Sequence, residues 1–412
     1  MALAAPGSPP LRAHARVALS DLAHSTGGRR LVVLGASFGG ISAALTVRRL
    51  IPDAEIVLVD QASLFILGPG AFRYAFGLTS FERIARPYTA LEAHGLGVLR
   101  ATVVALDRER RQLLTTEGRV TYDQLLVASG LRLAQEEIPG LPEELGGTNA
   151  CPYAMDASLL ELRRRIAAFR GGHVVIGTPE GPYKCPPAPY EYALFWARHI
   201  KARGLRGRVT LVDPRSRPTP LSLAPGLLQA MAAHRDVLAY EPFTRVLSLD
   251  AAAGSVETEA GRLRFDFLSL IPPNRVPRFL SEASLGDPFV EVDAQTFRTL
   301  SDNRIHAVGD VADTPYARTA FTAVSSGRIA AHSIARALGG AAAPVGPVEN
   351  LCFPQVSATR ALRIQTSWSH EQDPSGTPHV KTAGTVDNRP TSGSLRRRLE
   401  WEASVTGALF GH

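Results

Sequence analysis

The sequence predicts an α/β protein with two Rossmann-like dinucleotide-binding domains, the first interrupted by the second, and a small α+β C-terminal segment. Two strand–turn–helix–strand units carry this prediction, one starting near residue 30 and the other near residue 173. In each unit an apolar run of strand length precedes a turn and an amphipathic helix, and the next apolar run ends in an aspartate. Farther along, Gly309-Asp310 follows another apolar strand and indicates a return to the first domain.

The composition is that of a globular protein large enough for two or three domains. Of the 412 residues, 45% are hydrophobic and 20% are charged. The formal net charge of +7 comes from arginine, because lysine occurs only at Lys184, Lys201 and Lys381. The arginines are scattered and form no basic stripe with interleaved aromatic residues, so we expect no nucleic-acid binding. No apolar run approaches the length needed to span a bilayer.

Residues 1–28 are rich in Ala, Pro, Ser and Gly, and lack both a continuous apolar region and a twin-arginine start. We interpret this stretch as a disordered leader. Its composition is also compatible with an eroded export signal or a misplaced start codon.

The first unit carries a dinucleotide-binding fingerprint in the turn 35–40, which reads GASFGG. Gly35 makes the tight turn, Gly40 lets the helix pack closely on the strand, and the helix N-terminus faces a pyrophosphate. Asp60 ends the second strand, where a carboxylate can hold a ribose hydroxyl pair. Ser37 replaces the middle glycine and narrows the room for a pyrophosphate unless its side chain points away. The predicted elements are strands at 31–34 and 55–60 and a helix at 41–50.

Two further motifs indicate which cofactor this fingerprint binds. One buried strand ends in LLVASG at 125–130, and another is followed by Gly309-Asp310 and by a helix that opens near 318–320. In flavoproteins with two dinucleotide-binding domains such a Gly-Asp pair closes over the ribityl chain, so the sequence predicts FAD. The alternative is an ordinary aspartate at a strand end. The candidate cofactor-binding residues are Gly35, Ser37, Gly39, Gly40, Asp60, Gly130, Gly309, Asp310 and Thr319.

The second unit has a turn that is unsuited to a phosphate. Residues 177–182 read GTPEGP, where prolines and Glu180 replace the glycines that let a backbone approach a pyrophosphate. We therefore expect no pyridine nucleotide there. The turn instead places Cys185 just before a helix, whose dipole would stabilise a thiolate together with Lys184. The alternative is a buried cysteine in a Pro-rich turn. The predicted elements are strands at 173–177 and 208–213 and a helix at 190–203.

The number and spacing of the cysteines and histidines limit which metal and redox sites the chain can form. The three cysteines, Cys151, Cys185 and Cys352, are too few for a disulfide framework or a structural zinc site. If two of them lie close together in the fold, we interpret that pair as redox-active. No metal site is expected, because the histidines stand singly on strands or helix ends. They include His94, His173, His234 and His306.

The rest of the chain completes the two domains and adds a tail. Short apolar runs within 243–273 predict the strands that finish the second domain, and 341–347 reads as a linker. The tail predicts strands, a polar turn around Asn388-Arg389-Pro390, and an Arg-rich helix from Leu395 that packs on the first domain or, alternatively, lies on a membrane. The predicted segments are a leader at 1–28, the first half of the FAD-binding domain at 29–148, the second domain at 149–285, the second half at 286–345 and a C-terminal flavin-binding segment at 346–412.

The order of the motifs GASFGG, LLVASG, KCPPAPYE and IHAVGD resembles the flavoprotein subunit of flavocytochrome c sulfide dehydrogenase and, more distantly, sulfide:quinone oxidoreductases. The resemblance runs from about residue 29 to the end, and its most specific parts are CPPAPYE at 185–191 and the tail segments 349–353 and 399–411. It implies an FAD-dependent oxidoreductase that oxidises sulfide or a related sulfur compound through a redox disulfide of Cys185 and Cys352. It also implies that Glu191 is an acid or base beside them; alternatively, Glu191 only favours the helix dipole.

Two departures from that family matter. Its cytochrome-linked members often carry a cysteine after the second strand that bonds covalently to FAD, but 63–72 contains none, so we expect noncovalent FAD. Those members are also usually periplasmic, whereas the missing signal favours the cytoplasm. The resemblance implies a c-type cytochrome as electron acceptor. The alternatives are a sulfide:quinone oxidoreductase, a type II NADH dehydrogenase and a noncatalytic redox sensor. Cys151 is expected to be structural, although it is a rival partner for either other cysteine.

Overall fold

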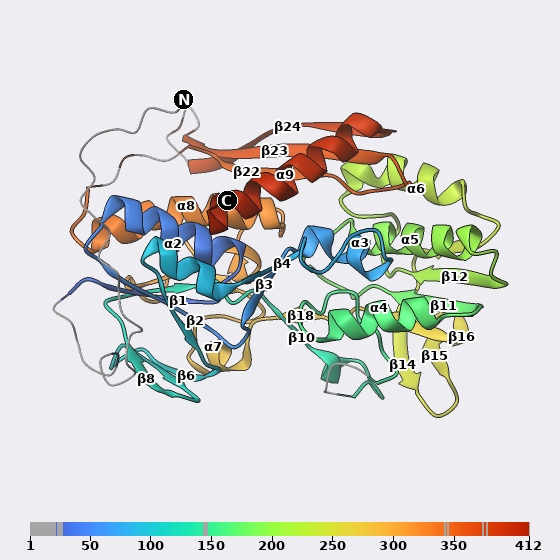
Figure 1. Ribbon diagram of the computed structural model, residues 1–412, viewed down its shortest axis with the longest axis horizontal. Coiled ribbons are helices and arrows are strands. Elements are labelled where there is room, and N and C mark those ends of the chain that lie inside the picture. Colours follow the sequence, from blue (N-terminus) through green and yellow to red (C-terminus); the bar gives the residue numbers. More distant parts are fainter. Residues whose placement is uncertain are drawn as a thin grey trace.

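The computed structural model describes residues 28–142, 147–341, 346–372 and 378–411, together with Leu22, Ala343 and Ser375. Most of the predicted leader and part of the predicted linker lie outside these residues. Two parallel sheets with helices packed on them form two domains, and an antiparallel sheet with the last helix lies across both, as Figure 1 shows.

The first domain is built on a five-stranded parallel sheet in the order β20-β9-β1-β2-β5. β20 pairs with β9, with Ile305 opposite Leu125, so a strand that comes after the second domain completes the sheet of the first. This interrupted arrangement is the predicted one. Every residue of β1 is buried, as expected for a central parallel strand. The strands are β1 Arg30–Leu34, β2 Glu55–Asp60, β5 Gly97–Arg100, β9 Gln124–Val127 and β20 Ile305–Ala307.

Two long helices pack together beside this sheet (Figure 1). α2 (Phe38–Leu50) begins at Phe38 and not at Ile41, because the last residues of the glycine turn already form its first turn. A Cβ on Gly327 of α8 (Ala320–Ala337) would lie only 2.4 Å from the carbonyl oxygen of Gly39, so glycine permits the close approach of the two helices.

The second domain is built on a four-stranded parallel sheet in the order β13-β12-β11-β17. α5 (Ala188–Ala202) packs on it and begins before the predicted residue 190, because Pro189 fits the first turn, where its missing N–H has no partner to lose. The fully buried Trp196 anchors α5 against Phe169 and Phe267. The sheet strands are β11 Gly172–Gly177, β12 Gly207–Val212, β13 Leu238–Glu241 and β17 Phe267–Leu270. Beside it lie α4 Ser158–Ala168, α6 Ala224–Ala232 and an antiparallel sheet of β14 Val246–Asp250, β15 Ser255–Thr258 and β16 Gly261–Arg264.

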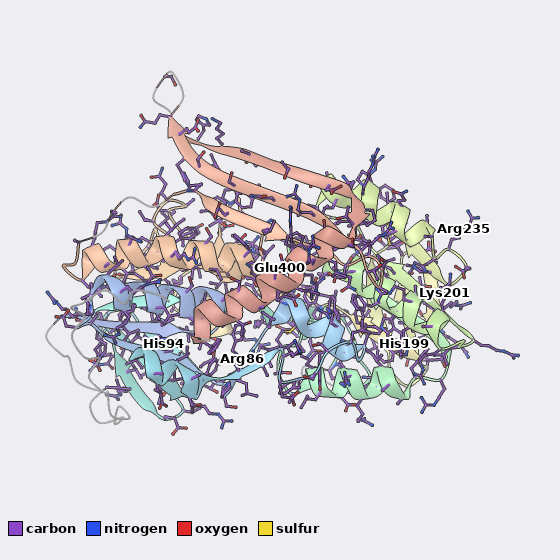
Figure 2. The ribbon with its side chains drawn as sticks, turned by 45° about the horizontal axis from the view of Figure 1, so that its top comes forward. Arg86, His94, His199, Lys201, Arg235 and Glu400 are labelled. Atoms are coloured by element: carbon purple, nitrogen blue, oxygen red, sulfur yellow. The ribbon has the colours of Figure 1, made fainter. Side chains whose placement is uncertain are left out.

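The tail forms an antiparallel sheet of β22 (Val348–Cys352), β23 (Ala361–Gln372) and β24 (Pro378–Thr391), followed by α9 (Ser392–Phe410). The predicted polar turn at 388–390 is wrong, because these residues continue β24. Asn388 explains the polarity: its Oδ1 accepts from the Gly226 N–H at 3.0 Å and its Nδ2 donates to the Ser222 carbonyl at 2.8 Å, which fastens the strand to the second domain. α9 contacts α2 and β23, and Figure 2 shows it crossing the molecule with Glu400 on it.

Short elements connect these units. The strands are β3 Leu64–Ile66, β4 Ala85–Pro87, β6 Val103–Asp107, β7 Gln112–Thr115, β8 Gly118–Thr121, β10 Arg132–Leu133, β18 Asn274–Arg275, β19 Val290–Glu291 and β21 Ala312–Asp313. The helices are α3 Ala71–Ala75 and α7 Arg278–Glu282, with single 3₁₀ turns at Gly68–Gly70, Tyr88–His94, Gln135–Glu137, Leu221–Leu223 and Gly309–Val311.

Candidate active site

The turn after β1 is shaped for close approach of a backbone to a ligand. Gly35 has a φ of +100°, and a Cβ there would lie 2.5 Å from the Ala128 carbonyl oxygen. A Cβ on Gly40 would lie 2.0 Å from the carbonyl oxygen of Gly35, so both positions require glycine. Ser37 is exposed and makes no capping hydrogen bond to α2. Its side chain therefore leaves the amide groups at the start of α2 open to an anion.

Asp60 ends β2 and reaches back to the same turn. Its Oδ2 accepts from the Ala36 N–H at 2.7 Å and its Oδ1 from the Ala62 N–H at 2.8 Å. Burial and the charge of Asp60 raise the pKa of Tyr88, whose hydroxyl also bonds to this carboxylate. A carboxylate has about four acceptor sites, so Asp60 is held rigidly in the ribose position and keeps capacity for a hydroxyl.

Gly309 and Asp310 follow β20 and contact the start of α8. Gly309 has a φ of +73°, and its N–H donates to the Ser326 Oγ at 3.3 Å. Burial raises the pKa of Asp310, while the charges of Lys184 and Arg318 oppose that rise. Within the described part of the chain, the Asp310 carboxylate accepts no hydrogen bond. The Asp310 side chain is partly exposed, so its carboxylate is free to accept a hydrogen bond from a bound ligand.

The remaining predicted cofactor residues stand around the same region. Thr319 caps α8, since its Oγ1 accepts from the Thr322 N–H at 3.2 Å, and it also donates to the Asn350 Oδ1 at 2.7 Å. Gly130 has a φ of +63°, and a Cβ there would meet open space. With the glycine cradle, the uncapped start of α2 and the unpaired Asp310, these residues fit the FAD that the sequence predicts.

Cys185 lies in a strained loop before α5. Its φ is +49°, in the left-handed region that a non-glycine residue adopts at a cost of about 1–3 kcal/mol. Three hydrogen bonds hold it there: its N–H donates to the Arg318 carbonyl at 2.8 Å, and its carbonyl accepts from the Ala188 N–H at 2.9 Å and the Tyr153 hydroxyl at 3.0 Å. Such strain is concentrated at functional sites, where the surrounding structure imposes it.

Cys352, at the end of β22, shares the environment of Cys185. Burial raises the pKa of Cys352 to about 12, with Glu191 adding to the rise and Arg398 opposing it. Burial also raises the pKa of Cys185, to which the charges of Cys352, Glu191 and Asp310 add while Arg398 opposes them. Both cysteines are free thiols in the structure. Two partly buried residues far apart in the sequence are thus brought to one site with the same charged neighbours.

The positive charge that acts on Cys185 belongs to Arg398 and not, as the sequence predicted, to Lys184. Lys184 lies over the ring of Tyr153, with its Nζ 5.8 Å from the ring centroid, and its charge lowers the pKa values of Asp310 and Cys151. The opposing positive charge at Cys185 comes from Arg398. The reason is tertiary: α9 returns from the far end of the chain and places Arg398 at the start of α5.

Glu191 lies in the first turn of α5 and is only 5% exposed. Its carboxylate is ion-paired with Arg398. Burial raises the pKa of Glu191, and the Arg398 charge and hydrogen bond oppose that rise. Arg398 is the residue that sequence reasoning missed. The available signal was Arg398 and Glu402 at i and i+4, in line with the apolar residues Val405 and Leu409 on the same face of α9.

The carboxylate that corresponds to a ribose ligand in the second domain is occupied by the domain's own groups. Asp213, the aspartate after β12, has no exposed surface. Its Oδ1 accepts from the Thr178 hydroxyl at 3.1 Å and from the N–H and Nη1 of Arg215 at 3.0 and 3.2 Å. Its Oδ2 accepts from the hydroxyls of Tyr190 at 2.5 Å and Tyr240 at 3.1 Å. The carboxylate that would hold a ribose in a nicotinamide site is therefore fully occupied.

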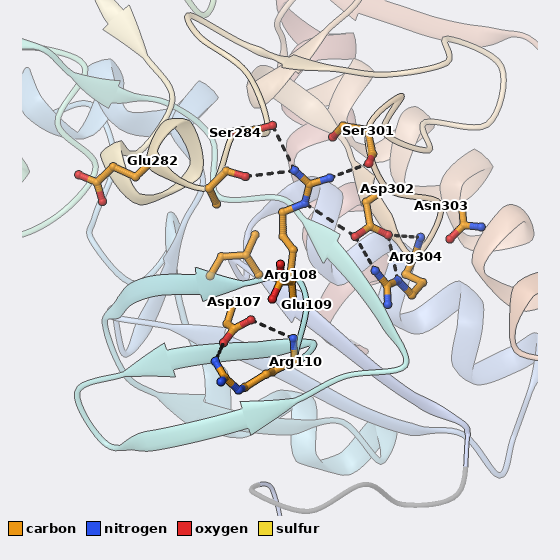
Figure 3. A pocket seen from close by; sticks show the side chains of 12 residues that line it. Asp107, Arg108, Glu109, Arg110, Glu282, Ser284, Ser301, Asp302, Asn303 and Arg304 are labelled. Atoms are coloured by element: carbon orange, nitrogen blue, oxygen red, sulfur yellow. Dashed lines mark hydrogen bonds and ion pairs between the residues drawn. The ribbon is translucent and has the colours of Figure 1, made fainter.

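Two surface cavities flank these regions. One, of about 530 Å³, lies beside the Cys185 loop and is lined by Tyr183, Pro186, Arg215 and Arg318, among others. The other, of about 850 Å³, is lined by residues of the first domain that Figure 3 shows, and none of them belongs to the cysteine site. Its Arg108 donates to the Ser301 carbonyl at 2.6 Å and to two further carbonyls, so its charge is already satisfied. We therefore place the chemistry beside the smaller cavity.

Cys151 stands apart from the pair. It is buried, and burial raises its pKa to about 11. Among the described residues, no group of three or more His, Cys, Asp or Glu side chains could hold a metal ion. Nor does this part of the chain contain a helix with the length and apolar character needed to cross a membrane.

Comparison with known proteins identifies the same two units. Residues 29–178 match the family described as pyridine nucleotide-disulphide oxidoreductase, and residues 159–272 match the central part of the sulfide dehydrogenase (flavocytochrome c) flavoprotein chain. The mitochondrial sulfide:quinone oxidoreductase of Dictyostelium discoideum is 24% identical over 311 residues, 73% of this chain and 69% of that protein.

A curated relative and a solved structure from Aquifex aeolicus extend the comparison. Its sulfide-quinone reductase is 28% identical over 194 residues, which are 46% of this chain and 44% of that protein. The solved sulfide:quinone oxidoreductase of this bacterium superimposes with a TM-score of 0.72 over 93% of this chain and 91% of that one, at 19% identity, and so shares the fold. These matches identify the chain as an oxidoreductase that is similar to the sulfide dehydrogenase flavoprotein chain and the sulfide:quinone oxidoreductases, and this likeness implies FAD as cofactor.

Proposed function

We propose that the protein is an FAD-dependent oxidoreductase that oxidises sulfide, or a related sulfur compound, through a redox disulfide of Cys185 and Cys352. The observation that carries this proposal is the shared environment of the two partly buried cysteines, which come from different domains and have Glu191 and Arg398 as common neighbours. The strained backbone of Cys185 and the names of the sulfide-oxidising relatives support it.

The chemistry starts from the disulfide. Hydrosulfide attacks one sulfur, the S–S bond breaks, and HS⁻ plus the disulfide gives a persulfide (Cys–S–SH) on one residue and a thiolate on the other. Reforming the disulfide releases one sulfur atom, one proton and two electrons. Bound FAD would supply the two-electron acceptor for this step and can be reoxidised one electron at a time.

Glu191 is the proton-transfer group of this scheme. It lies next to both thiols, and burial raises its pKa, which brings a carboxyl group closer to the range where it can exchange protons at neutral pH. It would take the proton from the incoming hydrogen sulfide and return it to the departing thiolate.

The FAD would be bound without a covalent link. Gly35, Gly40 and the start of α2 would hold the pyrophosphate, Asp60 a ribose and Asp310 the ribityl chain. The residues after β2 contain no cysteine that could bond to it.

The acceptor that we propose is a c-type cytochrome, as in the flavocytochrome whose central domain this chain matches. A quinone is the alternative, which the names of the curated relatives favour. NADH oxidation is disfavoured because Asp213 is occupied by five donors.

One anaerobic titration tests the proposal. Sulfide should bleach the flavin absorbance of the purified protein, and addition of a c-type cytochrome, or failing that a soluble quinone, should restore it. Cys185→Ser and Cys352→Ser should each keep FAD but lose sulfide-dependent bleaching by several orders of magnitude, while Cys151→Ser stays near wild type. Bleaching that survives in either of the first two variants would refute the disulfide mechanism.

A further inference from the structure

Arg398 is a buried junction between segments from three parts of the chain. Its side chain, on α9, is 6% exposed. Nη1 contacts the Glu191 carboxylate on α5 and donates to the Phe353 carbonyl at 3.1 Å, Nη2 donates to the Pro69 carbonyl, and Nε donates to the Glu402 carboxylate at 2.8 Å. Loss of this arginine would remove the ion-pair partner of Glu191 and one partner of Glu402, and among the described residues it would leave the Phe353 and Pro69 carbonyl groups without a hydrogen bond.

The charges around Arg398 are balanced. Glu191 and Glu402 flank it, and the second oxygen of Glu402 faces the Arg73 guanidinium at 3.9 Å. Two arginines and two glutamates thus alternate from α3 through α9 to α5. Arg73 is partly exposed, and burial of the other three charges is tolerable only because each has an opposite neighbour.

The Arg398 guanidinium acts on both cysteines, Cys185 and Cys352. Phe353, whose carbonyl it holds, directly follows Cys352 in the chain. The positive charge of Arg398 lowers the pKa values of Cys185 and Cys352, against the burial that raises them. The charged groups that face the two thiols are Glu191, Arg398 and, on the Cys185 side, Asp310. Arg398 is the positive charge that acts on both.

We propose that Arg398 is a positioning residue of the dithiol centre: it clamps Glu191 and the strand that carries Cys352 in one arrangement, and it balances the negative charge of the thiolate released when the disulfide opens. The inference rests on the proposed disulfide chemistry and assigns to α9 a role in it. Because a thiolate appears only after the S–S bond breaks, this charge would favour the opened form.

The test compares thiol ionisation in the full-length, FAD-loaded protein after mild reduction with a phosphine. The rate of carbamidomethylation of each cysteine is followed by mass spectrometry from pH 6 to 10. In Arg398→Met, alkylation of Cys352 at a given pH should slow by about tenfold or more, since an adjacent opposite charge shifts a pKa by about 1–3 units. Arg398→Lys keeps the charge and should retain most of the wild-type rate while losing the clamp.

The matched control is Arg396→Met on the same helix, where the side chain is 77% exposed and, within the described ranges, pairs with Glu400 alone. It should leave the alkylation profile unchanged. An Arg398→Met protein that melts earlier but alkylates like wild type would show a purely structural role and overturn the proposal.

A second variant keeps the test decisive if Arg398→Met does not fold. The pair Arg398→Met with Glu191→Gln removes both buried charges and should alkylate more slowly than Glu191→Gln alone; equal rates would overturn the proposal. Neither readout uses sulfide. If sulfide fails to reduce the wild-type flavin, the proposed function fails, whatever the alkylation profiles show.

Discussion

Replacing Asp213 by alanine should destabilise the second domain strongly without affecting cofactor use. The carboxylate is fully buried and accepts from five donors, of which the Thr178 and Tyr190 hydroxyls belong to residues at most 5% exposed. Leaving a buried donor without an acceptor costs about 1–3 kcal/mol, so these two hydroxyls predict a loss of about 2–6 kcal/mol in the free energy of unfolding. The Tyr240 and Arg215 side chains are partly exposed, so they can bond to water when the carboxylate is removed and are left out of this sum.

The assay is urea unfolding followed by tryptophan fluorescence, because Trp196 is buried in the second domain. The control is Asp236→Ala in the same domain, where an exposed ion pair with Lys201 predicts little or no loss of stability. A loss below about 1 kcal/mol in Asp213→Ala would refute the network. NADH should not bleach the wild-type flavin at a catalytic rate; NADH-dependent bleaching that disappears in Asp213→Ala would show that Asp213 holds a ribose after all.

Three further outcomes follow. Gly40→Ala places a Cβ 2.0 Å from the Gly35 carbonyl oxygen, so it should lower the free energy of unfolding by about 1–3 kcal/mol and weaken FAD retention. Thermal melting and flavin content measure the two effects. The control Gly393→Ala should show neither, because its Cβ meets no atom closer than 3.8 Å. Burial lowers the pKa of His306 to about 3, so between about pH 6.5 and that value only the unfolded chain binds a proton on this imidazole. The free energy of unfolding should therefore fall by about 1.4 kcal/mol per pH unit as the pH drops. His306→Gln should flatten this slope when unfolding is measured as a function of pH. Acid precipitation should release free FAD into the supernatant, and flavin that stays in the pellet would contradict noncovalent binding.

The parallel strands could be predicted because their cause is local. β1, β2 and β11 are short runs of Leu, Val and Ile, and their observed bounds lie within one residue of the predicted ones. A strand buried on both faces needs an apolar residue at every position, so it is visible in the sequence without knowledge of its neighbours. The glycine at position 40 is equally local, because its Cβ would meet Gly35 and Val33 of the same strand–helix unit.

Helix starts and the tail were less predictable. α2 and α5 each begin before the predicted residue, because the turn residues before them already adopt helical geometry. The stretch Asn388-Arg389-Pro390 has the composition of a turn but lies in β24, where Asn388 bonds to the second domain. Pro390 is tolerated there because β24 is an edge strand, which has no further partner to receive its missing N–H.

The sequence alone therefore determined the two nucleotide-type units and the dinucleotide fingerprint, and by family resemblance it predicted that Cys185 pairs with Cys352. Only the tertiary structure decided which charges surround that pair. Arg398 comes 207 positions after Glu191, and no spacing rule connects two residues that meet because α9 folds back over both domains. Likewise, Asp213 has the place of a ribose ligand in the sequence, but the hydroxyls that occupy it come from neighbouring elements. Local patterns specify backbone geometry, whereas the partner of a buried charge is set by long-range packing.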